Sequence, residues 1–182
     1  EPSLFREIVE SGNTVRGLVA PVSYSRKTSD EIDGFVKQLG GAGVAWVKVS
    51  KEGWTGTPPV KKAGTDAIDA LISHSGAKPG ETIFMIAGDR MEVLNLLGVL
   101  RLELARREGW IPKDKWNFLW IVDFPLFEFD PVAARWVSLH HPFTSPVPDD
   151  LSILETDPGK VRARAYDLVL NGVECGGGSV RI

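Results

Sequence analysis

The clearest chemical signal in the sequence is a pair of carboxylates near its C-terminal end. Two β-type runs flank Asn171-Gly172, a dipeptide that favours the type I′ turn of a two-residue hairpin. In such a hairpin Val169 faces Glu174, and because side chains alternate along a strand, Asp167 lies on the same face. Two carboxylates on one face offer oxygen ligands to Mg²⁺, with water and phosphate completing the shell. A solvated sheet face is the alternative interpretation.

Three consecutive glycines, Gly176 to Gly178, lie inside the second strand of this hairpin. Glycine weakens a strand and often marks a bulge or the close approach of a ligand. A regular strand would place Glu174 and Arg181 on opposite faces, whereas one bulged residue in the triplet brings them to one face. Arg181 would then offer a planar fork to a carboxylate or phosphate beside the carboxylate pair. A flexible bend without a function explains the triplet equally well.

Two adjacent histidines, His140 and His141, connect the end of a β-type run to a proline-rich loop. A histidine in this position can reach a site that the sheet holds. Because adjacent strand residues point to opposite faces, we expect at most one of the two to face a given pocket. Capping or packing of the loop is the alternative role, and no cluster of Cys and His residues has zinc-ligand spacing.

A group of lysines near two tryptophans is the best candidate for a nucleic-acid surface. The group comprises Lys48, Lys51, Lys61 and Lys62, near Trp46 and Trp54. Cations position phosphates and aromatic rings stack on bases, which is the basis of this hypothesis. The alternative is a solvated charge cluster with Trp46 in the core.

The composition is that of a globular chain. With 182 residues, of which 43% are hydrophobic and 25% charged, the sequence can form one domain or two small ones around a packed core. The formal net charge of −3 argues against bulk electrostatic binding to nucleic acid. A single cysteine and the lack of a long apolar run predict a cytoplasmic chain that has no membrane partner. Because the sequence begins at Glu1 without an initiator methionine and stops inside an apolar alternation, we expect a piece of a longer protein.

Two regions with different patterns must position these residues, and a break at 109–115 separates them. The first region alternates helical and strand-like patterns, with a loop expected at 53–59. Its expected helices are a short one capped by Ser3, one that follows a capping box at Thr28 to Glu31, one at 65–74 and one at 91–107; its expected strands are 15–20, 44–49 and 83–87. The second region has short β-type runs at 118–123, 127–130, 136–139, 166–170 and 173–182, with a helical turn or two within 150–164.

Four blocks of the second region resemble bacterial-type aspartyl-tRNA synthetases, which are class II synthetases. The blocks are 120–128 (WIVDFPLFE), 140–146 (HHPFTSP), 165–174 (AYDLVLNGVE) and 176–182 (GGGSVRI). Their order and spacing are those of the segment between motifs 2 and 3 of the family. Residues 1 to about 115 resemble the GAD insertion domain of this family, which also occurs in a tRNA-dependent amidotransferase.

The resemblance covers essentially the whole chain and implies an α+β fold. It implies a two-layer α/β GAD insertion domain over residues 1–115. A partial antiparallel β-sheet of the class II catalytic domain would follow over residues 116–182.

The resemblance also implies roles for the residues singled out above. Asp167 and Glu174 would be catalytic and would hold Mg²⁺, and Glu174 would also bind ATP during adenylate formation. Arg181 would clamp the side-chain carboxylate of L-aspartate, and His140 would complete the aspartate pocket with His141 as its neighbour. The aspartyl group then passes to the terminal ribose of tRNA, and the intact enzyme would be a homodimer.

The sequence also departs from the family in ways that limit this interpretation. The motif 2 arginine, motif 3, the motif 1 dimer element and the anticodon-binding barrel are not found in it, so we expect the chain alone to be inactive. Cys175 stands where the family more often has a small aliphatic residue, and we expect it to pack without a catalytic role.

Two alternatives to a synthetase fragment remain open at this stage. The first is a non-enzymatic tRNA-binding GAD module, against which Glu174, Arg181 and the histidine pair argue because they lie outside that domain. The second is a degenerate synthetase-like scaffold, which only the missing flanks can distinguish from an active enzyme.

Overall fold

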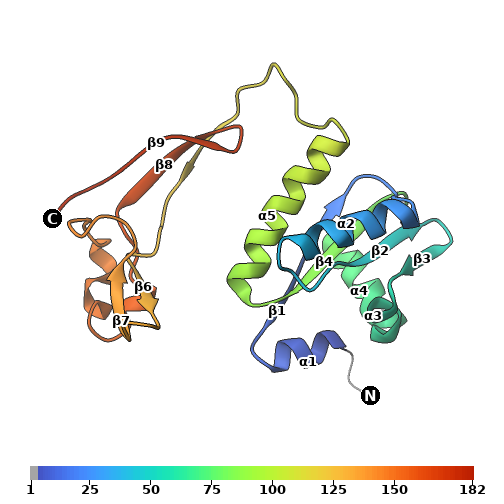
Figure 1. Ribbon diagram of the computed structural model, residues 1–182, viewed down its shortest axis with the longest axis horizontal. Coiled ribbons are helices and arrows are strands. Elements are labelled where there is room, and N and C mark those ends of the chain that lie inside the picture. The colour runs from blue at the N-terminus through green and yellow to red at the C-terminus, as the bar shows by residue number, and fades with distance from the viewer. Residues whose placement is uncertain (1–3) are drawn as a thin grey trace. The chain divides into compact units, whose positions relative to one another are not determined.

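The computed structural model describes residues 4–182, so the expected cap at Ser3 lies outside the described residues. The chain divides into two compact units, Glu1–Ile111 and Pro112–Ile182, and the division falls inside the break between the two sequence patterns. The structure confirms an α+β fold with antiparallel sheets (Figure 1). No helix in the described part is long and apolar enough to cross a lipid bilayer.

The first unit is a four-stranded antiparallel sheet with helices on both faces. Its elements are α1 (Leu4–Glu10), β1 (Thr14–Ala20), α2 (Arg26–Gln38), β2 (Ala45–Ser50), β3 (Gly53–Gly56), α3 (Pro58–Ala63), α4 (Thr65–Ser75), β4 (Thr82–Gly88) and α5 (Arg90–Arg107). The strand order is β1-β4-β2-β3.

The inner strand β4 explains why helices cover both faces of this sheet, where the resemblance implies two layers. Phe84 and Ile86 pack in one core cluster with residues of α2 and α5, such as Leu100. Ile83 and Met85 point to the opposite face and pack with residues of α3 and α4. Since successive residues of a strand alternate between faces, a run that is apolar at every position must be covered on both sides.

Two predictions about the first unit are wrong in detail. Helix α2 begins three residues before the expected point, because the hydroxyl of Ser25 accepts a hydrogen bond from the backbone N–H of Thr28 at 3.1 Å and caps the helix. The expected loop at 53–59 contains strand β3 and the start of α3. Pro58 occupies the first turn of α3, where its missing N–H costs no intrahelical hydrogen bond.

The second unit is built from short strands. They are β5 (Phe118–Ile121), β6 (Phe127–Asp130), β7 (Arg135–Ser138), β8 (Ala165–Leu170) and β9 (Val173–Ser179), with 3₁₀ turns at Pro148–Ile153 and Pro158–Lys160. Strands β5, β8 and β9 form one antiparallel sheet in the order β5-β8-β9, and β6 pairs with β7. A small core forms around Leu126 and Val161.

The predicted hairpin is present between β8 and β9. Asn171 and Gly172 have positive φ angles of 51° and 85°, as a type I′ turn requires. The side chain of Asn171 also fastens the turn to the segment before β5. Its Oδ1 accepts from the backbone N–H of Asn117 at 2.9 Å, and its Nδ2 donates to the carbonyl of Lys115 at 2.8 Å.

Packing of α5 against the sheet should dominate the stability of the first unit. Leu100 is fully buried, whereas Leu94 on the same helix is 44% exposed. We expect Leu100→Ala to lower the free energy of unfolding by about 2–5 kcal/mol, because it leaves a cavity in the core. The matched control Leu94→Ala should cost less than about 0.5 kcal/mol. Urea unfolding followed by helical circular dichroism measures both, and equal losses would contradict the assigned core.

Candidate active site

The two carboxylates predicted from the hairpin lie on one face of the β5-β8-β9 sheet. Val169 pairs with Glu174 and Leu170 with Val173, which is the predicted register. Asp167 lies two residues before Val169 on β8 and therefore shares its face. Asp167 is half-buried and Glu174 is exposed. Within residues 4–182 neither carboxylate has a hydrogen bond or an ion pair of its own, so both are free to accept ligands.

A bulge in β9 determines which other residues reach that face. Glu174 pairs with Val169 and Gly176 with Leu168, so the extra residue is Cys175. The bulge was expected inside the glycine triplet, and the structure corrects its position by one residue. Alternation from Gly176 to the end of β9 places Gly177 and Ser179 on the face of Glu174. That Arg181, two residues beyond the strand, shares this face stays a prediction.

Cys175 does not have the packing role that the sequence predicts. As the bulged residue it is exposed, and its Sγ donates to the backbone carbonyl of Leu168 at 3.3 Å. The bulge removes the Cys175 side chain from the regular alternation of the strand. Simple alternation therefore predicted a packed side chain, whereas Cys175 is exposed.

The glycine triplet makes room for side chains of the neighbouring strand. A Cβ atom at Gly177 would overlap Oδ1 of Asp167, and one at Gly178 would lie 2.9 Å from the Tyr166 hydroxyl. The bare backbone of Gly177 thus allows the Asp167 carboxylate to lie across β9. The triplet is therefore more than a flexible bend, because Gly177 leaves space for Asp167, a candidate metal-binding residue.

Arg181 follows β9 and is joined to the loop that contains the histidines. Thr144 and Arg181 form an isolated antiparallel bridge, and Nη1 of Arg181 donates to Oγ1 of Thr144 at 3.4 Å. The backbone N–H of Thr144 in turn donates to the carbonyl of His141 at 2.9 Å. Sequence reasoning did not single out Thr144, because a threonine in a proline-rich loop has no spacing signal.

The two histidines have different surroundings. The ring of His140 lies edge-on to Phe124, with ring centroids 5.0 Å apart. Nδ1 of His141 accepts from the backbone N–H of Phe143 at 3.2 Å, which supports the loop-packing interpretation for this residue. Both side chains are exposed. Thr144 joins the loop to Arg181. Among the described residues, no hydrogen bond or ion pair links either imidazole to Asp167, Glu174 or Arg181.

An ion pair between the buried Asp150 and the partly exposed Arg162 lies next to the end of this loop. The guanidinium of Arg162 donates to both carboxylate oxygens of Asp150, at 2.8 and 3.0 Å, and also lies 3.5 Å from Asp123. These hydrogen bonds, together with one from the Arg162 backbone, hold the pKa of the Asp150 carboxyl below its ordinary value. Asp123 has a left-handed φ of 58°, so the turn that leads to Phe124 is fixed between this ion pair and the core.

The donor set on the sheet face fits a hard cation in part. Asp167 and Glu174 provide carboxylate oxygens, which Mg²⁺ prefers, and Mg²⁺ usually keeps several waters or substrate phosphates as its other ligands. The described residues contain no group of three or more His, Cys, Asp and Glu side chains that could hold a metal by themselves. This chemistry therefore fits a metal that arrives with a phosphate ligand.

The lysine group in the first unit does not form an open stacking surface. Lys48 lies with its Nζ 4.3 Å from the centroid of the Trp46 ring, and burial lowers the pKa of Lys48 although Asp30 opposes the shift. Trp46 and Trp54 are half-buried and pack against the two cores. These contacts favour the core interpretation of Trp46.

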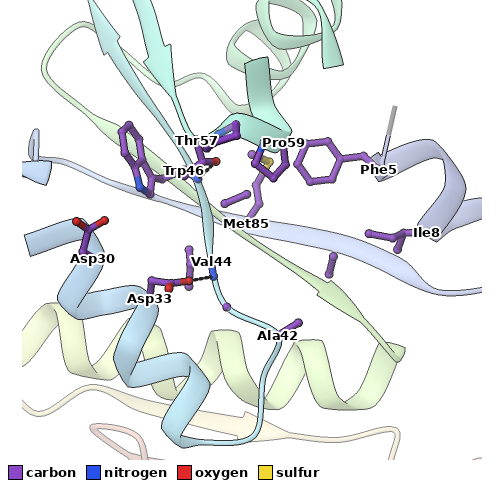
Figure 2. Close-up of a pocket in the computed structure, with 14 residues that line it drawn as sticks. Phe5, Ile8, Asp30, Asp33, Ala42, Val44, Trp46, Thr57, Pro59 and Met85 are labelled. Atoms are coloured by element: carbon purple, nitrogen blue, oxygen red, sulfur yellow. Dashed lines mark hydrogen bonds between the residues drawn. The ribbon is translucent and has the colours of Figure 1, made fainter. Parts of the chain in front are cut away.

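A pocket of about 360 Å³ lies beside Trp46, around the start of β2 (Figure 2). There the Asp33 carboxylate accepts a hydrogen bond from the backbone N–H of Val44 at 2.8 Å. The pocket is lined by Asp30 and Asp33 and by none of the four lysines, so its charge is unsuited to phosphate.

Comparison with known proteins identifies the family. The model of the tRNA synthetases class II (D, K and N) matches residues 14–182. The chain belongs to this class II synthetase family. It is 47% identical to the aspartate-tRNA ligase of Halalkalibacterium halodurans, 45% to that of Enterococcus faecalis and 44% to the aspartate-tRNA(Asp/Asn) ligase of Geotalea uraniireducens. Each match covers 98% of the chain but only 30% or 31% of the relative, so this family member spans less than a third of their length.

The Asp150–Arg162 ion pair should hold the loop of this synthetase chain at neutral pH. Because the folded-state pKa of Asp150 is lowered, its contribution to stability is complete above its ordinary pKa of 3.8 and is lost as the pH falls through the lower folded-state value. We expect Asp150→Asn to reduce amide-exchange protection at 161–165 at pH 7, with the exposed Asp149→Asn as the control. Wild-type protection factors should fall in the same segment on acidification below about pH 4. Equal protection in the two variants would contradict this role.

Proposed function

We propose that the chain is an internal part of an aspartate-tRNA ligase. The whole enzyme would activate L-aspartate with ATP and Mg²⁺ to aspartyl-adenylate and transfer the aspartyl group to tRNA in the cytoplasm, as a homodimer. The observation that carries the proposal is the common sheet face of Asp167 and Glu174, to which the guanidinium of Arg181 is added two residues beyond the end of β9. The names of the relatives support aspartate as the amino acid.

Asp167 and Glu174 are the residues that would hold Mg²⁺ and, in the case of Glu174, contact ATP. A bound magnesium ion would neutralise the negative charge of the ATP phosphates. The protein contributes two oxygen donors on one face, because the register of the hairpin sets the face of both residues and the bare backbone of Gly177 leaves room for the Asp167 carboxylate.

Arg181 would bind the side-chain carboxylate of aspartate. A guanidinium donates two parallel N–H groups to a carboxylate, whereas the amide of asparagine offers one acceptor and a clashing pair of donors. A site built to pair with a carboxylate thus rejects the amide strongly. His140 would border the aspartate pocket with His141 beside it, and the loop that carries both is joined to Arg181 through Thr144.

The isolated chain should not catalyse the reaction. It spans about 30% of the length of its relatives, and the described residues contain no group of three or more His, Cys, Asp and Glu side chains that could hold a metal. The remaining part of the enzyme must supply those groups.

Replacing Arg181 by lysine tests the assignment of aspartate recognition. In the full-length protein we expect Arg181→Lys to raise the KM for aspartate about 10- to 100-fold, because lysine cannot form the two-pronged contact. The KM for ATP should change by less than about twofold. Aspartate-dependent pyrophosphate exchange measures both constants, and equal losses for the two substrates would defeat the assignment. Binding of tRNA without any aspartate activation by the wild type would instead favour a tRNA-binding module.

Replacing Glu174 by glutamine tests the metal and ATP role. We expect Glu174→Gln in the full-length protein to reduce pyrophosphate exchange by more than roughly 100-fold and to shift its magnesium dependence to higher concentration. The control Glu128→Gln removes an exposed carboxylate on β6 and should leave exchange unchanged. Unaltered exchange in Glu174→Gln would count against the proposed role.

A further inference from the structure

Thr144 is a buried polar residue at the junction between the histidine loop and the end of β9. Its residue surface is only 4% exposed, although most of the surrounding loop is exposed or half-buried. A hydroxyl that is removed from water must find hydrogen-bond partners inside the protein. The identity of those partners indicates what the residue does.

Backbone hydrogen bonds hold Thr144 in one place. Its own N–H donates to the carbonyl of His141 at 2.9 Å, which closes a turn in the loop. On either side of it, the N–H of Ser145 donates to the carbonyl of Val180 at 2.8 Å and the N–H of Ile182 to the carbonyl of Phe143 at 3.0 Å. The loop is therefore paired through an isolated antiparallel bridge with the segment that carries Arg181, so these hydrogen bonds oppose independent movement of the two.

The hydroxyl of Thr144 has two side-chain partners. A guanidinium has donors and no acceptor, so Oγ1 of Thr144 must accept from Nη1 of Arg181, 3.4 Å away. Oγ of Ser179 lies 3.3 Å from Oγ1, and either hydroxyl can donate in this hydrogen bond. The contact with Nη1 is the one through which Thr144 acts on the orientation of the guanidinium.

We propose that Thr144 is a positioning residue that orients the guanidinium of Arg181 toward the aspartate carboxylate. The inference rests on the proposed function. Thr144 engages one of the five N–H groups of Arg181 and leaves the others for the substrate, so the pocket meets aspartate with its arginine already oriented. The loop that carries the histidines thereby sets the geometry of the arginine.

The test compares two substitutions in the full-length protein. Thr144→Val keeps the shape of the side chain and removes the hydroxyl, whereas Thr144→Ser keeps the hydroxyl. We expect the valine variant to raise the KM for aspartate by roughly tenfold, the effect of losing about one hydrogen bond, and to leave the KM for ATP within about twofold. The serine variant should restore most of the affinity for aspartate. Discrimination against asparagine should weaken in the valine variant alone.

Two further variants separate positioning from a loss of stability. Thr82 is a fully buried threonine in the first unit whose hydroxyl donates to the carbonyl of Val22 at 2.9 Å. Thr82→Val removes a comparable hydrogen bond and should lower the melting temperature without changing the KM for aspartate. If Thr144→Val does not fold, Ser179→Ala removes the second hydroxyl that holds the Thr144 side chain and should raise the KM for aspartate by a smaller factor.

The outcomes distinguish this inference from the proposed function. An unchanged KM for aspartate in the valine variant, a serine variant as impaired as valine, or equal rises for aspartate and ATP would each overturn the positioning role. The same holds for an unchanged KM in Ser179→Ala if that variant must be used. A wild-type protein that shows no aspartate-dependent exchange would overturn the proposed function and, with it, this inference.

Discussion

The register of the β8–β9 hairpin is the constraint on which the candidate site depends. Asn171-Gly172 closes the turn with two positive φ angles, and this fixes which residues of the two strands face one another. Because side chains alternate, a slip of one residue would send Asp167 and Glu174 to opposite faces. The bulge at Cys175 then sets the phase of the rest of β9, which brings Gly177 opposite Asp167. Local backbone geometry thus decides where the two carboxylates lie.

The two ends of the site are held by different kinds of interaction. The carboxylate pair depends on strand register, whereas Arg181 depends on the loop that pairs with it through Thr144. That loop is anchored in turn by the ion pair of Asp150 and Arg162. A change in the hairpin register or in the loop would move the carboxylates relative to Arg181. Small displacements of this kind lower the rate of an enzyme even when they arise far from the reacting atoms.

The sequence predicted the hairpin and the common face of its carboxylates, because a two-residue turn and strand alternation are local rules. It also predicted most helices and strands of the first unit from periodicity. The position of the bulge was predicted one residue too late. Glycine is the residue type that most often marks a bulge, whereas the bulged residue here is Cys175. The sequence missed Thr144 and the Asp150–Arg162 pair because their partners lie 37 and 12 residues away. Those contacts depend on tertiary structure, which no local pattern encodes.

The outer strand of the β5-β8-β9 sheet has a practical consequence for handling the chain. Phe118, Leu119 and Trp120 are each at least half exposed, so β5 presents apolar side chains on both of its faces. An unpaired strand edge with exposed apolar residues promotes contact between copies of a protein. A net charge of −3 gives little mutual repulsion to oppose it. Strand β5 therefore provides an apolar edge that promotes association of this chain in solution.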